Sequence, residues 1–345
     1  MFTRARILTV IIASFGTVVF WGLGLPLSFL FGPMFACLIA ALCGAKLEGF
    51  GQISVAARTI LGVAVGAAIT PDVVDQLPQM ALSVALIPVF IFLSGLIGLP
   101  FFHRICGFDR ATAYYAAMPG GLQDMVVFGQ EAGGDVRALS LIHATRVLIL
   151  VSLAPILMTT LLGASLDNPL GAPLQDLPFS EMLLMIAAAL IGWKGGERIG
   201  LFGASILGPM ILTATLSLTG FIHTRPPAEA ILTAQFLLGS AIGAFYVGVT
   251  LKELRNTVVS AVVFVLILAM VATVLAEILV LAGFAQPLEA FLAFFPGGQA
   301  EVTMLAIVAG ADLGFVIVHH LTRIIVVIVG APIMANLLFK DRNIS

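Results

Sequence analysis

Two segments of the chain carry the same polar and helix-breaking residues at the same spacing, and these are the first candidates for chemistry. Each has Pro-Gly-Gly, an acidic residue three positions later, and His-x-x-Arg further along. The residues are Pro119, Gly120, Gly121, Asp124, His143 and Arg146 in the first segment and Pro296, Gly297, Gly298, Glu301, His320 and Arg323 in the second. Apolar composition alone does not reproduce rare polar residues at one offset, so the chain contains an internal repeat.

The Pro-Gly-Gly elements predict a break in a helix, because proline removes a backbone donor and glycine permits unusual dihedral angles. Such a break exposes amides and carbonyls that can hold an ion or an anionic group at a helix N-terminus. We therefore take all six residues of the two elements as candidate substrate-binding residues. Gln123 and Gln299 lie beside them and are further polar candidates, although they do not align with each other.

The two acids have two interpretations. Asp124 and Glu301 could complement the dipole of a helix in its first turn. They could instead bind a functional proton or cation, because acidic side chains in the hydrocarbon region of a membrane are costly and tend to be functional.

The His-x-x-Arg pairs also leave two interpretations open. The i, i+3 spacing places His143 with Arg146, and His320 with Arg323, on one helix face. Each arginine could pair with the acid of its own segment and so fix the broken helix, or it could grip an anionic substrate in a bidentate manner. The histidines could shuttle protons, and hydrogen-bonded core histidines are equally compatible.

Three further features predict local structure. Asp135 and Asp312 each precede the helix that carries His-x-x-Arg, and we expect them to be its N-cap. Gly32 and Gly208, each followed by Pro-Met, are expected to be helix breaks or points of close packing.

Composition places the chain in a membrane. Of its 345 residues 60% are hydrophobic and 10% charged, with a mean hydropathy of +1.14, whereas soluble domains carry roughly 25% charged residues. No basic stripe suits a nucleic-acid backbone. The five histidines and three cysteines show no metal-ligand spacing, so we expect no metal, no cofactor and no enzymatic activity.

The repeat divides the chain into residues 1–163, a polar linker over 164–180, and residues 181–345. Each half holds six apolar blocks, and the fifth (111–131 and 288–308) contains the Pro-Gly-Gly.

Basic residues of short loops mark the cytoplasmic side. Those that the rule assigns there are Arg4, Arg6, Lys46, Arg104, Arg110, Lys194, Arg198, Lys252, Arg255, Lys340 and Arg342. All these basic residues lie on the cytoplasmic side if block five is a re-entrant hairpin that enters and leaves the membrane on one side. Each half then has about five transmembrane helices plus one hairpin. An odd number of crossings makes the second half inverted relative to the first. This topology places both termini in the cytoplasm. Arg225 is the one basic residue that it places on the opposite side. The alternative topology is twelve plain transmembrane spans with parallel repeats.

Pro119 to Arg146 and Pro296 to Arg323, in a duplicated membrane unit, resemble the bacterial AbrB-type membrane protein family, which is distinct from the soluble DNA-binding regulator of that name. The resemblance covers essentially the whole chain. The family is often labelled as an ammonia monooxygenase or a regulator. The resemblance implies a multi-pass protein of the bacterial inner membrane that looks like a transporter, and it carries over no catalytic residue.

Together these patterns predict an all-α polytopic membrane protein that is a secondary transporter of a small organic anion or similar polar solute, coupled to a proton or sodium gradient. Its partners would be the solute, the coupling ion and the lipid bilayer; a homodimer is compatible with this architecture. An ion or solute channel and a membrane-bound regulatory subunit are the alternatives.

Overall fold

The computed structural model describes residues 3–25, 27–201 and 203–339, and the regular secondary structure of these ranges is all helical, without strands. The side chains of Gln123, Asn336 and Phe339 also lie outside the description. The candidate role of Gln123 therefore falls on a side chain that the structure does not describe. The prediction of an all-α membrane protein is confirmed.

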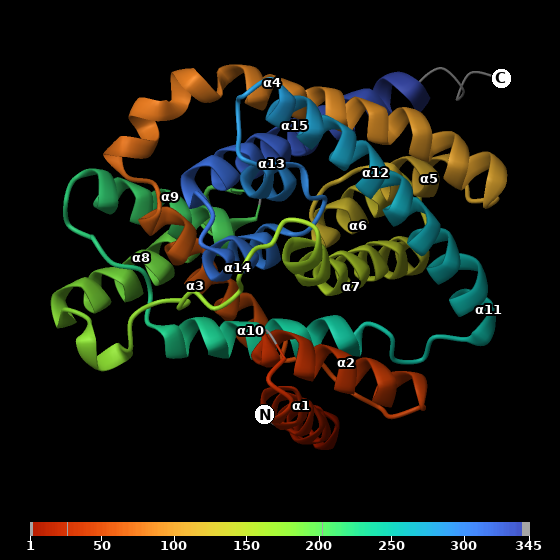
Figure 1. The fold of residues 1–345 in the computed structure, drawn as a ribbon. Helices are drawn as coiled ribbons and strands as arrows, with labels where there is room; N and C mark the ends of the chain where they lie inside the picture. Colours follow the sequence, from red (N-terminus) through yellow and green to blue (C-terminus); the bar gives the residue numbers. More distant parts are fainter. Residues whose placement is uncertain (1–2, 26, 202, 340–345) are drawn as a thin grey trace. The chain divides into compact units, whose positions relative to one another are not determined.

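Apart from two short helices in the second half and the position of the π-helical turn, the two halves contain the same order of helices (Figure 1). The first half comprises α1 (Arg4–Gly22), α2 (Ser28–Leu42), α3 (Gln52–Ala67), α4 (Pro71–Pro100) with the π-helical turn η1 (Phe101–Ile105), α5 (Arg110–Ala117), α6 (Leu122–Glu131) and α7 (Val136–Thr160). The second comprises the short η2 (Leu174–Asp176), then α8 (Phe179–Arg198), α9 (Ala204–Leu218), α10 (Ala228–Ala244), α11 (Leu251–Glu253), the π-helical turn η3 (Leu254–Val258), α12 (Val259–Leu281), α13 (Pro287–Phe294), α14 (Gln299–Ala309) and α15 (Leu313–Phe339).

Six helical stretches within the described ranges are long and apolar enough to cross a bilayer. They are Arg4–Gly22, Pro71–Ile105, Val136–Thr160, Phe179–Arg198, Leu251–Leu281 and Leu313–Ala335. The remaining apolar helices are shorter. The protein is thus a multi-pass membrane protein, while the inverted relation of the halves and the re-entrant path of block five stay predictions.

Spatially the chain forms two compact units, each of which takes helices from both halves of the sequence. Unit 1 comprises Met1–Gln76, Gly163–Val249 and Thr303–Gly314, and unit 2 comprises Leu77–Leu162, Thr250–Val302 and Phe315–Ser345. The sequence repeats, with their boundaries at 163 and 181, divide the chain differently from these compact units. The repeat boundaries stay a prediction.

Unit 1 is held together by glycines that let helix backbones approach closely. A Cβ at Gly62 of α3 would collide with the Ile206 carbonyl of α9, and a Cβ at Gly239 of α10 would collide with the Leu30 carbonyl of α2. The contacts are reciprocal, because the third helix of each half packs along the second helix of the other. Small residues at helix contacts are the usual means of packing helices in membranes.

The two Gly-Pro-Met elements lie within unit 1 and act as close-packing points. Gly32 meets the backbone of Gly16 in α1, and Gly208 meets that of Gly192 in α8. The alternative expectation of a helix break at these elements is wrong. Helices α2 and α9 continue through their prolines, because each proline lies within the first two turns of its helix, where few i to i−4 hydrogen bonds are lost.

Unit 2 has an aromatic core that joins helices from both halves. Phe102 of η1 contacts Phe264 of α12 with ring centroids 4.8 Å apart, and Phe90 of α4 meets Phe294 of α13 edge-on at 6.1 Å. The Tyr114 hydroxyl of α5 donates to the Ala331 carbonyl of α15 at 3.0 Å. These contacts fix the helices that surround the Pro-Gly-Gly elements.

Candidate functional site

Each Pro-Gly-Gly element lies in an interrupted helix, as the sequence predicts. Helix α5 ends at Ala117 and α6 begins at Leu122, so Pro119 to Gly121 form the break. In the second half α13 ends at Phe294 and α14 begins at Gln299, which leaves the second Pro-Gly-Gly in the gap. The backbone of each break has carbonyls that no helical hydrogen bond satisfies.

Arg146 bridges the first break. Its Nη1 donates to the Met118 carbonyl at 2.9 Å, and its Nη2 donates to the Gly120 carbonyl. The side chain is buried in α7. The guanidinium thus satisfies two carbonyls in a region where unpaired polar groups are costly.

Arg323 repeats this arrangement at the second break. Its Nη1 donates to the Phe295 carbonyl at 2.7 Å and its Nη2 to the Gly297 carbonyl at 2.6 Å. It is likewise buried. The fork of donors matches the spacing of the two carbonyls in both halves, which a lysine ammonium could not reproduce.

The histidines bind the end of the preceding half-helix. His143 Nε2 lies 3.1 Å from the Tyr115 carbonyl, and His320 Nε2 lies 2.8 Å from the Leu292 carbonyl. A carbonyl only accepts, so Nε2 carries the proton in both rings. His320 Nδ1 then accepts from Arg323 Nη2 at 3.1 Å. We call His143, Arg146, His320 and Arg323 the carbonyl clamp.

The two acids lie at the start of the second half-helices. A Cβ at Gly121 would collide with the carboxylate of Asp124, and a Cβ at Gly298 would collide with that of Glu301. Each carboxylate therefore folds back over the first turn of α6 or α14, where it complements the positive end of the helix dipole. Glu301 is buried, whereas Asp124 is partly exposed.

The structure brings the two breaks together within unit 2. The charges of Arg146 and Arg323 are close enough to interact electrostatically, and Arg146 also interacts with Glu301 of the other half. Gly120 lies against Val327 of α15, since a Cβ there would come within 2.9 Å of it. Arg146, Arg323 and Glu301 thus form one charged group to which both halves contribute.

A small, largely apolar cavity adjoins the second break. Pro296 and Phe295 line it together with Leu150 of α7 and Thr273 of α12. Its volume is about 30 Å³, which is room for a single water molecule.

The local predictions around the site have separate outcomes. Asp135 is confirmed as the N-cap of α7, because its side chain accepts from the Ala138 amide at 3.0 Å. Asp312 directly precedes α15, and its role as a cap stays a prediction. Gln299 is buried in the first turn of α14.

Sequence reasoning missed the carbonyl partners of the clamp. Tyr115 and Met118 supply them through their backbones, so their side-chain types carry no signal. Pro119 does give a sequence signal for these free carbonyls. It has no amide hydrogen and therefore cannot donate to a carbonyl of the preceding turn.

Comparison with known proteins identifies relatives along nearly the full length. The family model described as "Transition state regulatory protein AbrB" matches residues 29–339. The chain is 24% identical over 329 residues to a protein of Escherichia coli K12 named as the regulator AbrB, covering 92% of this chain and 91% of that protein. It is 25% identical over 301 residues to the protein YhjN of Bacillus subtilis strain 168, covering 81% and 77%.

Proposed function

The chain belongs to the AbrB family, and from this premise we propose that it is a secondary transporter of a small organic anion or similar polar solute, driven by a proton or sodium gradient. One observation carries the proposal: two broken helices meet in one compact unit, with two arginines and an acid buried around the breaks. Irregular backbone at membrane depth is tolerated where it is buried in protein or lines a solute path, and paired broken helices are typical of secondary transporters.

The arginines would position the backbone and supply the positive charge for the anion. Their Nη groups are occupied by the carbonyls of the breaks, and within the described part of the chain the Nε atoms of Arg146 and Arg323 are buried without a hydrogen-bond partner. Each guanidinium therefore keeps at least its Nε–H as an unused donor for a solute. This combination favours a carboxylate or sulfonate over a cation.

The acids would provide the coupling. The carboxylates of Asp124 and Glu301 occupy the same positive helix ends that an anion would use, so they compete with it. Protonation would discharge a carboxylate and leave the helix end available. A proton and an anion would then bind together, which is the logic of symport.

Alternating access would come from movement of the elements that carry the breaks against the remaining helices. The four clamp residues, both Pro-Gly-Gly elements and both acids belong to unit 2. Unit 2 therefore contains a complete site, which supports its movement as one body.

The charges of unit 2 support a cytoplasmic position for the start of α12. Arg137 of α7 donates to Glu253 of α11 at 3.0 Å, and both lie at the end where α12 begins with Lys252 and Arg255 close by. Where α12 ends, the chain carries the acid Glu277 instead. Basic residues accumulate on the cytoplasmic side of bacterial inner-membrane proteins.

Uptake by purified protein in liposomes tests the proposal. Carboxylates and sulfonates would be offered under an imposed pH or sodium gradient, with ionophore-treated liposomes as control. Saturable uptake that collapses with the gradient supports a secondary transporter. Flux that rises linearly with concentration and ignores the gradient would make the protein a channel, and the absence of flux for every solute would favour a regulatory role.

A further inference from the structure

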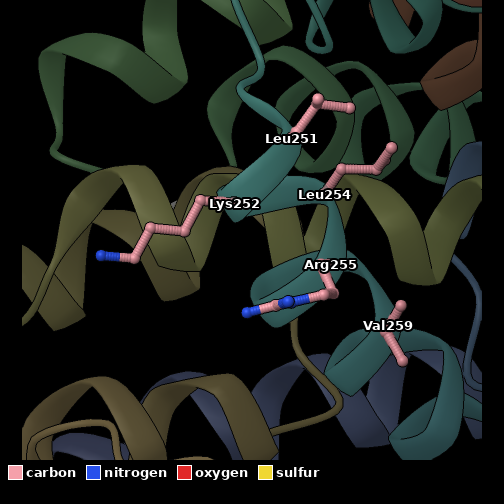
Figure 2. Close-up of a pocket in the computed structure, with 5 residues that line it drawn as sticks. All are labelled: Leu251, Lys252, Leu254, Arg255 and Val259. Carbon is pink, nitrogen blue, oxygen red and sulfur yellow. The ribbon is translucent and has the colours of Figure 1, made fainter.

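A basic pocket lies at the start of the second half's long central span, and no clamp residue lines it. Leu251, Lys252, Leu254, Arg255 and Val259 form this open pocket of about 580 Å³. Figure 2 shows that Lys252 and Arg255 extend toward the same side, while the three apolar side chains extend away from them. The pocket therefore has a charged side and an apolar side.

Local hydrogen bonds fix this turn of the chain. Thr250 and Glu253 form a capping box, in which the Thr250 amide donates to Glu253 at 2.8 Å and the Glu253 amide donates back to the Thr250 hydroxyl at 3.2 Å. The π-helical turn η3 follows. Lys252 and Arg255 are three residues apart, which places them on one face.

The basic pair keeps its charge available. The neighbouring acid, Glu253, is occupied by Thr250 and by Arg137 of α7. Arg255 uses Nε to donate to the Asn256 side chain at 3.3 Å. Within the described ranges neither Lys252 nor Arg255 forms an ion pair, so two positive charges face outward together.

The apolar side of the pocket continues into a membrane span. Leu251 is 85% exposed and Val259 is 52% exposed, and both belong to the apolar stretch Leu251–Leu281. Basic side chains above exposed apolar ones match a phospholipid, whose phosphate lies at the interface and whose acyl chains lie below it.

The first half provides an internal contrast. At the positions equivalent to Lys252 and Arg255 it has Asp75 and Pro78. An anionic group would be repelled there. The pocket is therefore a property of one half only, as expected where only one leaflet presents its anionic lipids to basic residues.

We propose that this pocket binds the phosphate of an anionic phospholipid from the surrounding bilayer, with Lys252 and Arg255 on the phosphate and Leu251 and Val259 along the acyl chain. The site is independent of the solute site and would anchor the start of α12 at the interface.

The test compares phosphatidylglycerol, phosphatidylcholine and inorganic phosphate as ligands of the full-length protein in detergent, by native mass spectrometry and thermal unfolding. We expect phosphatidylglycerol to bind selectively and the Lys252→Gln/Arg255→Gln variant to bind it at least about tenfold more weakly. The matched control is Lys194→Gln/Arg198→Gln, which removes the same charge from exposed positions of α8 and should leave binding unchanged.

Equal weakening in both double variants would reduce the effect to overall charge and overturn the proposal, as would unchanged binding in the first. If inorganic phosphate stabilised the protein as strongly as phosphatidylglycerol does, the proposal that the ligand is a lipid would be overturned. The single variants Lys252→Gln and Arg255→Gln, each expected to weaken binding about threefold, keep the test decisive if the double variant does not fold.

Discussion

At the scale of single residues, the polar side chains of the site act first on the backbone of their own chain. Arg146 and Arg323 each close a helix break, and His143 and His320 bind the turn before it. Holding the break open with fixed donors leaves the helix ends in place for a solute.

Truncating a clamp arginine should destabilise the protein. Arg146→Ala would leave the Met118 and Gly120 carbonyls buried without donors, which should cost roughly 2–5 kcal/mol, whereas Arg146→Lys can still serve one carbonyl and should cost about half as much. Thermal unfolding in detergent measures the difference. Wild-type stability of the alanine variant would show that the guanidinium does not hold the break, and wild-type stability of the lysine variant would show that the fork of donors is unimportant.

The glycine before each second half-helix is required by the carboxylate, not by its backbone angles. Gly121 has φ −64°, which any residue can adopt, so Gly121→Ala should destabilise only through the collision with Asp124. We expect a cost of about 1–3 kcal/mol that falls sharply in the Asp124→Ser background. A double-mutant cycle by thermal unfolding checks this, and full additivity would disprove the steric explanation.

At the scale of elements, the helices of unit 1 depend on close approach. Gly62→Ala would place a Cβ against the Ile206 carbonyl of α9, force α3 away from that backbone and should lower stability by about 2 kcal/mol or more. Gly195→Ala in α8 is the matched control, because no neighbour stands near its added Cβ and helix propensity should even improve by up to about 1 kcal/mol. Comparable losses in both variants would show that crowding is not the cause.

The start of α1 is tied to the loop after α2 by a charged contact. Glu48 accepts from the Thr3 hydroxyl at 2.6 Å and pairs with Arg6 at 2.6 Å, and these contacts hold the pKa of Glu48 below its usual range. Because the folded pKa is depressed, the contact stabilises fully above the ordinary glutamate pKa and is lost as pH falls through the folded value. The protection of amides at the start of α1 against hydrogen exchange, relative to their intrinsic exchange rates at each pH, should therefore fall in acid in the wild type, and Glu48→Gln should lack that loss of protection.

The sequence predicts the local features of these elements well. The helix breaks at Pro119 and Pro296 and the cap at Asp135 depend on residues a few positions apart. The acceptors of the clamp could not be predicted, because Arg146 meets the Met118 carbonyl across 28 residues and only after α7 has packed on the break. Of the two expectations for Gly32, close packing is confirmed, and the sequence could not decide between them because the contact with α1 forms only in the folded chain.

At the scale of the whole molecule, sequence halves and compact units do not coincide. Duplication is visible in the sequence, whereas the exchange of helices between halves requires tertiary contacts such as Tyr114 with Ala331. The result is one unit with all the candidate solute chemistry and another built on glycine contacts. In the proposed transport mechanism, unit 2 would therefore be the element that moves.

The central claim is that an anion and the two carboxylates compete for the same helix ends, and ligand-induced thermal stabilisation across pH tests it most directly. Small carboxylates and sulfonates would be screened with the wild type and with Asp124→Asn/Glu301→Gln. We expect stabilisation of the wild type to grow as pH falls, and the variant to be stabilised equally at all pH values, at the level of the acidic wild type. Stabilisation with the same pH dependence in both proteins, or none by any anion in either, would contradict the account.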